Sequence, residues 1–358
     1  MNSGCRSRNS DVVRRTAAVA TLLLMFSPAS SAAAGERYAL IVTGASGGDA
    51  YAQKYAKWRA SFVDTLRGKF HYEPQRLIVL ADVASRLGSG QALRPSAGQA
   101  LRPGSGQADE GALPATRENV RAALVDLRKR MTKDDQLLVL LIGHGTSLDG
   151  DEAKFNLVGP DLSASEWSGL LRPLPGRLLF VNTTGASFPF LRTLAEKGHV
   201  VLTATDSAAQ QFETVFPEFF IKAFDDPAAD LDRNNRVSMW EAFTYASAGV
   251  RQWFEQKGQL PTERPLLDDT GAGVGREAQS PGTDGAIARV TYLEPDVALT
   301  LPADTALAGL MRRRAELETL LEELKARKES TPPDQYDADL EKLLVEIARL
   351  SARIRAKS

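Results

Sequence analysis

Cysteine is nearly absent from this sequence. The single cysteine, Cys5, stands near the start of the 358-residue chain, ahead of a short apolar segment. One thiol cannot form an intramolecular disulfide, and a chain without its first residues has no thiolate nucleophile. Cysteine-based catalysis is therefore excluded for any form of the protein from which Cys5 is removed.

Histidine and net charge are scarce too. There are 3 histidines, and 44 basic residues face 45 acidic ones, which leaves a formal net charge of −1. A near-neutral chain has no general attraction for phosphate backbones, so nucleic acid is not an expected partner. The remaining composition, 43% hydrophobic and 25% charged, is typical of a globular protein.

Residues 1–34 have the pattern of a secretory signal peptide. Basic residues up to Arg15 are followed by the apolar stretch 16–26 and by small residues before Gly35. The apolar stretch is too short for a comfortable membrane span. We expect an exported protein, periplasmic or secreted, with no stable membrane span once this segment is cleaved. An uncleaved N-terminal anchor is the alternative.

Apolar runs alternate with helical patterns over residues 35–258. Strands are expected at 37–44, 76–82, 136–142, 177–182 and 199–205, and helices at 51–70, 116–131, 163–171, 187–197 and 238–254. Such alternation is typical of a parallel sheet with right-handed crossovers. The sequence therefore predicts an α/β domain with a mostly parallel sheet flanked by helices.

Two of the expected strands end abruptly in small polar residues. Segment 136–142 runs into Gly143, His144 and Gly145, and segment 177–182 is followed by Thr184. Ligands and chemistry in open α/β sheets gather at the carboxyl ends of the strands. His144 and Thr184 are therefore the candidate catalytic residues.

The order of these features resembles the legumain and caspase superfamily of cysteine peptidases. Its members carry a catalytic His in a His-Gly turn after one strand. A catalytic Cys follows the next strand, in a stretch similar to Glu-Ala-Cys-Glu-Ser-Gly-Ser. His144 and Gly145 match the first motif, and aligning 180–185 with the second puts Thr184 where the Cys belongs. The resemblance covers residues 37–253 and implies a caspase-like three-layer sandwich.

Threonine in place of the nucleophilic cysteine leaves two functions open. The first is a catalytically inactive pseudopeptidase that binds a peptide or protein in the former cleft. The second is an active hydrolase in which His144 acts as general base or acid and Thr184, with Thr183 and Ser187 as neighbours, supplies the nucleophile. No local motif names a group that would orient His144, so the first is preferred.

The turn after the first expected strand offers a remote alternative. Residues 43–48 read TGASGG, which is similar to the phosphate-binding turn of NAD(P)-binding oxidoreductases. Ala50 takes the place of the third glycine, and Asp82 lies farther along the chain than the acidic residue of that motif. A tight strand-to-helix turn is the preferred interpretation.

Residues 84–113 form an insert with a tandem repeat, QALRPSAG followed by QALRPGSG. Its Gly, Ser, Pro and Gln bury too little apolar surface to offset the entropy lost on ordering. We expect a mobile surface loop. A substrate-facing lid or a processing site is the functional alternative.

Segment 230–241 carries oxygen donors at the spacing of an EF-hand loop. The expected Ca²⁺ ligands are Asp230, Asp232, Asn234, the backbone carbonyl of Arg236, Ser238 and Glu241. Asn235 replaces the usual glycine, and Asn tolerates the left-handed backbone needed there. Ser238 and Glu241 also form a capping box for the next helix, which explains only two of these donors.

The C-terminal part separates into a linker and a helical segment. Residues 259–302 are polar, with room for one strand within 286–301. Residues 303–358 carry two helical patterns with Leu and Ile at coiled-coil spacing, broken apart at Pro332 and Pro333. An antiparallel helical hairpin is predicted. Its apolar stripe needs a partner, so self-association or docking through this segment is a hypothesis.

Overall fold

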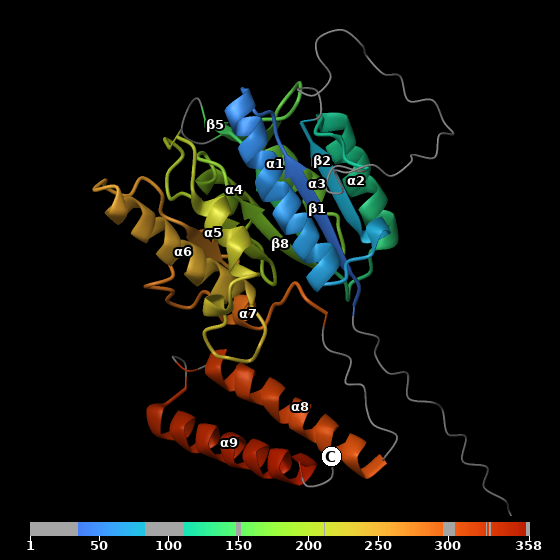
Figure 1. The fold of residues 1–358 in the computed structure, drawn as a ribbon, viewed down its shortest axis with the longest axis vertical. Helices are drawn as coiled ribbons and strands as arrows, with labels where there is room; N and C mark the ends of the chain where they lie inside the picture. Colours follow the sequence, from blue (N-terminus) through green and yellow to red (C-terminus); the bar gives the residue numbers. More distant parts are fainter. Residues whose placement is uncertain are drawn as a thin grey trace, which may run out of the picture. The chain divides into compact units, whose positions relative to one another are not determined.

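The computed structural model describes residues 35–82, 111–147, 152–210, 212–295, 305–326, 328 and 331–355 (Figure 1). The expectations for residues 1–34 and for most of the insert 84–113 lie outside these described residues. Within the described parts, no helix has the length and apolar character required to cross a membrane.

Seven strands of the described chain form one sheet. Its order is β10-β9-β8-β4-β1-β2-β3, with β1 at Arg37–Thr43, β2 at Leu77–Ala81, β3 at Leu113–Pro114, β4 at Gln136–Ile142, β8 at Arg177–Asn182, β9 at Val200–Thr203 and β10 at Leu266–Asp268. Neighbouring strands are parallel except for the pair β9 and β10. The predicted α/β class with a mostly parallel sheet is confirmed.

Helices cover both faces of this sheet, as Figure 1 shows. They are α1 at Asp49–Asp64, α2 at Arg117–Arg130, α3 at Ala164–Leu171, α4 at Phe188–Leu194, α5 at Phe216–Ala223 and α6 at Met239–Gln256. Alternate strand residues point to opposite faces. Ile41 packs with residues of α1, α5 and α6, whereas Leu40 packs with residues of α2, α3 and α4.

Side-chain caps start three of the helices. The hydroxyl of Thr116 accepts the backbone N–H of Asn119 at 3.3 Å. Capping boxes are formed by Ser163 with Glu166 in α3 and by Ser238 with Glu241 in α6. Each cap satisfies backbone donors that have no partner within the helix.

A small antiparallel sheet follows β4. Its strands are β5 at Gly145–Ser147, β6 at Ala153–Phe155 and β7 at Leu162–Ser163. Gly145 pairs with Phe155 in this sheet. The pairing anchors the chain directly after His144.

The segment expected to be a linker differs from its prediction. It supplies the edge strand β10, and a short helix, α7 at Ala286–Arg289, stands where a strand is expected. The buried carboxylate of Asp269 accepts the backbone N–H groups of Gly285, Ile287 and Ala288. This long-range cap favours the helix, and Tyr292 makes only an isolated bridge to Ser238.

The C-terminal end is all-helical, with α8 at Thr305–Ala326 and α9 at Pro333–Arg355. Leu317, Leu321 and Leu324 of α8 are buried. Nη2 of Arg313 lies 3.1 Å from a carboxylate oxygen of Glu346.

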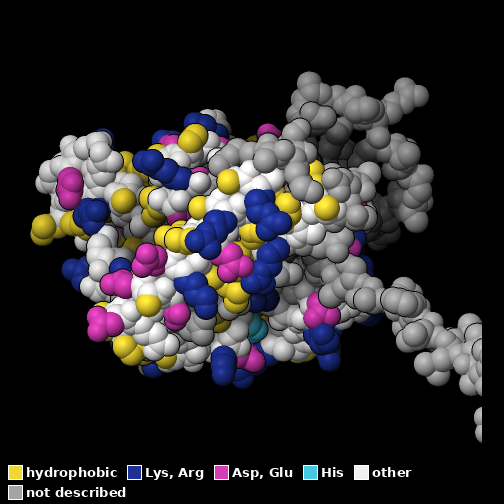
Figure 2. All heavy atoms as spheres, turned by 90° about the horizontal axis from the view of Figure 1, so that it is seen from below, with side chains coloured by type: hydrophobic (Ala, Val, Ile, Leu, Met, Phe, Trp, Pro, Cys, Tyr) yellow, Lys and Arg dark blue, Asp and Glu magenta, His cyan; other side chains and the backbone are white. Residues whose placement is uncertain are grey.

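Charges of both signs are mixed on the face of the molecule drawn in Figure 2. Lysine and arginine side chains gather near the middle of this face, with acidic and apolar side chains between and around them. The near-neutral composition agrees with this mixture.

Candidate functional site

The two candidate catalytic residues follow neighbouring strands. Strands β4 and β8 are parallel, with Leu141 opposite Asn182, so their carboxyl ends meet at one edge of the sheet. His144 comes two residues after the end of β4, and Thr184 comes two residues after the end of β8. The fold therefore brings both residues to the same edge.

The imidazole of His144 is held by two groups far away in the sequence. Nε2 lies 3.2 Å from the carbonyl oxygen of Ser46 and 3.2 Å from the hydroxyl oxygen of Tyr55. A carbonyl oxygen can only accept, so this contact requires a hydrogen on Nε2. In the neutral imidazole, Nδ1 then carries the lone pair and is the nitrogen able to take a proton.

Two tyrosines of α1 flank this histidine. Tyr55 is 1% exposed, and its burial, with Glu213 and Tyr51 adding to the effect, raises the pKa of its hydroxyl. Tyr55 therefore remains a neutral hydrogen-bonding group. The ring of Tyr51 meets the imidazole edge to face, with the ring centres 4.7 Å apart, and is partly exposed. Both side chains limit the rotation of His144.

Thr184 is fully buried. Its backbone N–H donates to Oδ1 of Asn182 at 3.0 Å, while its own hydroxyl has no hydrogen-bond partner among the described residues. A Cβ placed on Gly145 would lie 2.5 Å from this hydroxyl oxygen. Thr184 thus packs against the residue after His144, but no hydrogen bond in the described part of the chain joins Thr184 to His144.

The neighbouring hydroxyls are committed to structural hydrogen bonds. Thr183 donates to the carbonyl of Leu141 at 2.7 Å. The hydroxyl oxygen of Ser187 accepts the N–H groups of Ala204 and Thr205 at 3.1 and 3.2 Å. These bonds join the end of β8 to its neighbouring strands. The hydroxyl of Thr184, in contrast, makes no structural hydrogen bond to the described residues.

Two carboxylates near the start of α5, those of Glu213 and Glu263, are paired or buried. Glu213 lies 2.8 Å from Nζ of Lys54, which joins α1 to the segment before α5. Glu263 accepts the N–H groups of Val215 and Phe216 at the start of α5. Burial raises the pKa of Glu263 to about 7, although these two hydrogen bonds act in the opposite direction.

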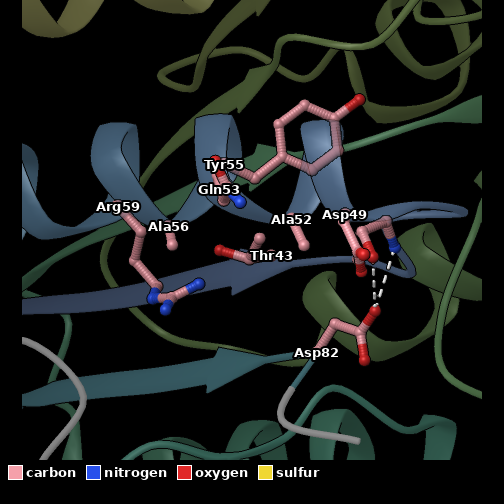
Figure 3. Close-up of a pocket in the computed structure, with 10 residues that line it drawn as sticks. Thr43, Asp49, Ala52, Gln53, Tyr55, Ala56, Arg59 and Asp82 are labelled. Atoms are coloured by element: carbon pink, nitrogen blue, oxygen red, sulfur yellow. Dashed lines mark hydrogen bonds between the residues drawn. The ribbon is translucent and has the colours of Figure 1, made fainter. Parts of the chain in front are cut away.

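The glycine-rich turn after β1 is fixed by an acidic residue. One carboxylate oxygen of Asp82, at the end of β2, accepts the N–H of Ser46 at 3.0 Å and its hydroxyl at 2.9 Å, as drawn in Figure 3. A cleft of about 190 Å³ lies beside this turn, between α1 and the ends of β1 and β2. Asp82 thus holds the turn whose carbonyl orients His144.

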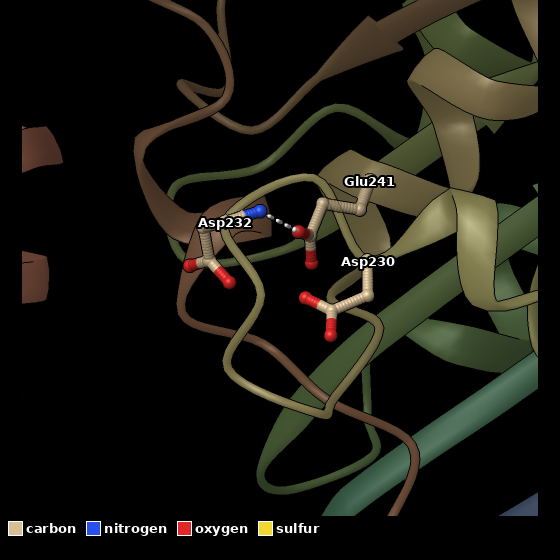
Figure 4. A group of neighbouring side chains, drawn as sticks. All are labelled: Asp230, Asp232 and Glu241. Atoms are coloured by element: carbon tan, nitrogen blue, oxygen red, sulfur yellow. Dashed lines mark hydrogen bonds between the residues drawn. The ribbon is translucent and has the colours of Figure 1, made fainter.

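A second site is formed by the loop before α6. One carboxylate oxygen each of Asp230, Asp232 and Glu241 lies within 4.8 Å of the others, and Figure 4 shows the three side chains gathered around one space. Oxygen atoms about 2.4 Å from a shared Ca²⁺ ion would be separated by at most about 4.8 Å. The cluster has the size and the donor type for a hard metal ion.

The other predicted ligands are Asn234, the backbone carbonyl of Arg236, and Ser238. The amide oxygen of Asn234 accepts the N–H of Arg236 at 2.8 Å, and the Ser238 hydroxyl is used by the capping box. The guanidinium of Arg236 lies 3.8 Å above the ring of Tyr292. Asn235 has the left-handed φ of 65° that its position requires. Of the six predicted ligand residues, the three carboxylates Asp230, Asp232 and Glu241 lie together.

Sequence reasoning missed the groups that hold His144. Tyr55 belongs to the apolar stripe of α1, where a tyrosine fits the core as well as a phenylalanine does. The only feature of the sequence that points to Tyr55 is its hydroxyl, because a buried hydroxyl requires a hydrogen-bond partner. Ser46 contributes a backbone carbonyl, which no side-chain pattern can reveal.

Comparison with known protein families and with curated proteins gives no match. Among solved structures, the chain is similar to the crystal structure of protein GSU0716 from Geobacter sulfurreducens. The TM-score is 0.38 and the identity 13%, over 65% of this chain and 92% of that one. A likeness of this size identifies neither a fold family nor a function.

Proposed function

We propose that this chain is an exported, legumain- and caspase-like domain that binds a peptide or protein at the His144 edge without cleaving it. The observation that carries the proposal is the environment of Thr184. This residue takes the position of the nucleophile in the resemblance, yet it is 0% exposed. A nucleophilic hydroxyl requires access to the substrate carbonyl and a base within hydrogen-bond reach, and Thr184 has neither among the described residues.

The caspase-like frame is part of the same proposal. It is supported by the order of the strands, in which the His-bearing strand lies beside the strand that would carry the nucleophile. The contact between the carbonyl of Ser46 and His144 adds support, since it supplies an orienting group that the local sequence lacks.

An active hydrolase is the second candidate. The deduced lone pair on Nδ1 of His144 and the uncommitted hydroxyl of Thr184 favour it. It requires a movement that exposes Thr184 and brings it to the imidazole. The NAD(P)-binding alternative has less support, because Asp82 and Ser46 bind each other at the glycine-rich turn.

The test is incubation of the purified protein with a mixed peptide library, read by mass spectrometry, beside His144→Ala and Thr184→Ala. We expect no cleavage from any of the three, and retention of a subset of peptides by the parent. Cleavage by the parent that both variants lose would establish the hydrolase instead. Neither cleavage nor retention by a folded sample would reject both functions.

The acidic loop is proposed to bind Ca²⁺. The three converging carboxylates carry this proposal, and the all-oxygen donor set suits a hard cation rather than zinc or copper. Asp230 and Asp232 are on the loop and Glu241 is in the first turn of α6, so the ion would hold the loop against the start of α6. A structural role follows more naturally than a sensing role.

Calorimetric titration with Ca²⁺ and thermal unfolding test this second proposal. We expect binding by the parent and a rise in Tm, because the ion binds the folded loop. Asp230→Asn should weaken binding at least tenfold, and Asp134→Asn, an exposed carboxylate elsewhere, should not. A parent that binds no Ca²⁺ at millimolar concentration would reject it.

The C-terminal helices are proposed to form an antiparallel hairpin that docks on another chain or on a second copy. Buried leucines on α8 and the ion pair between Arg313 and Glu346 support the pairing of α8 with α9. Leu320, Leu344 and Val345 remain exposed and offer apolar contacts for a partner.

A further inference from the structure

The cleft between α1 and the ends of β1 and β2 does not include the acidic loop or Thr184, whereas Ser46 and Tyr55, which hold His144, both line it. Its volume is about 190 Å³, which is room for roughly six water molecules. Ala52 and Ala56 line it from α1, so small side chains leave this space open. The cleft opens at the carboxyl edge of the parallel strands, where ligands of α/β sheets bind.

The wall of the cleft contains an unsatisfied hydroxyl. Thr43 is 2% exposed, and its Oγ1 has no hydrogen-bond partner among the described residues. A buried hydroxyl left unpaired costs free energy, so native structures nearly always satisfy it. A bound ligand that hydrogen-bonds to Thr43 would remove this cost.

Charges of opposite sign stand at the two ends of the cleft, as Figure 3 shows. The buried guanidinium of Arg59 lies at one end, with the hydroxyl of Thr43 directed toward it. The carboxylates of Asp49 and Asp82 lie at the other end. Arg59 and Asp82 each already have a partner within the chain, so a ligand's additional hydrogen bond is assigned to Thr43.

We infer that this cleft binds a small zwitterion, with its carboxylate at Thr43 and Arg59 and its ammonium group at Asp49 and Asp82. A simple anion is disfavoured, because the two carboxylates would repel it. Asp49 and Arg59 are ten residues apart on α1, so their Cα atoms are separated by about 15 Å along the helix axis. Their side chains turn inward, which brings the two charged groups closer than that. The charges of the ligand are therefore farther apart than in one α-amino acid, and a dipeptide has the required form.

The experiment uses the full chain and three probes of nearly equal shape. Glycylglycine carries both charges, propionylglycine has a methyl group in place of the ammonium group, and glycylglycinamide has an amide in place of the carboxylate. Binding is followed by calorimetry and by shifts of the backbone amide NMR signals at residues 43 and 49. We expect only glycylglycine to bind.

Two variants locate the binding in this cleft. Thr43→Val has the same shape and removes only the hydroxyl. It should weaken binding about tenfold, the size expected for one hydrogen bond, and raise the Tm of the free protein. Asp49→Asn, at an exposed position, should also weaken binding. Asp134→Asn, an exposed carboxylate that does not line the cleft, should bind as the parent does.

Three results would overturn the inference. The first is the absence of glycylglycine binding up to about 10 mM, where a Kd of 1 mM would nearly saturate the site. The second is equal binding of propionylglycine or glycylglycinamide. The third is equal affinity of the parent, Thr43→Val and Asp49→Asn, which would place the ligand elsewhere.

Discussion

Thr184 packs against Gly145, and this contact decides how much room the residue after His144 has. A Cβ on Gly145 would meet Oγ1 of Thr184 at 2.5 Å and its Cβ at 3.2 Å. The nearest obstacle is the Thr184 side chain, with the backbone carbonyl oxygen of Lys154 at 3.3 Å, and Gly145 itself has no positive φ. Gly145→Ala should therefore lower the free energy of unfolding by about 1–3 kcal/mol.

A double-mutant cycle checks this contact. Thr184→Ala removes the obstructing oxygen, so Gly145→Ala should cost much less in that background, with a coupling of about 0.5–3 kcal/mol in urea unfolding. Gly48→Ala is the matched control, since a Cβ added at Gly48 would have no atom of the described residues within 4 Å. Equal costs of Gly145→Ala in both backgrounds would show that Thr184 is not against Gly145.

Glu263 gives the protein a pH-dependent stability. Its folded pKa is about 7, above the ordinary value of 4.5, because burial disfavours the charged carboxylate. Below pH 4.5 the group is neutral in both states and has no effect. Between pH 4.5 and 7 the unfolded chain ionises while the folded chain keeps its proton, so stability falls as pH rises, by about 3 kcal/mol in total.

Glu263→Gln should abolish this decline. The measurement is urea unfolding at a series of pH values from 4 to 8, with exposed Glu255→Gln as control. The control should keep the slope of the parent. A Glu263→Gln protein with the parent's slope would mean that another group is responsible.

At the scale of elements, local patterns predict those parts of the fold whose cause is local. Strands β1, β4 and β8 are runs of aliphatic residues between polar ends, and each is found within a residue or two of its expected range. The capping boxes of α3 and α6 are likewise visible in the sequence. The alternation of these elements was sufficient to predict the α/β class.

Elements with a distant cause were not predictable. Helix α7 depends on a cap from Asp269, which is 16 or more residues away from the N–H groups it accepts. The orientation of His144 depends on Ser46 and Tyr55, at separations of 98 and 89 residues. Periodicity reports on neighbours along the chain, so it identified His144 but not the groups that hold it.

The cap on α7 can be tested by Asp269→Asn. The carboxylate is 2% exposed and accepts three N–H groups at 2.8 to 2.9 Å. An amide replaces one acceptor oxygen by an N–H₂ group that faces donors, so we expect a loss of about 2–3 kcal/mol in urea unfolding. Hydrogen exchange at residues 285–288 should become faster. Unchanged exchange there would show that α7 forms without this cap.

At the scale of the whole molecule, the C-terminal helices stand outside the two apolar cores. The two core clusters that enclose the sheet contain no residue of α8 or α9 among the residues that the structure describes. The sheet and its covering helices therefore have the apolar contacts needed to fold without the C-terminal helices. Leu320, Leu344 and Val345 on α8 and α9 are exposed, and these are the contacts for the association proposed above.

Truncation after residue 302 separates folding from association. The shortened chain should keep a cooperative thermal transition with nearly the parent's Tm, because its core is complete. By light scattering, the full chain should be a dimer and the truncated chain a monomer. The full chain with Leu344→Lys should also be a monomer, because a charge at that exposed position opposes apolar docking. If the full and truncated chains are both monomeric, self-association is ruled out and the helices must dock on a different protein. Loss of the cooperative transition on truncation would instead mean that the sheet requires α8 and α9 to fold.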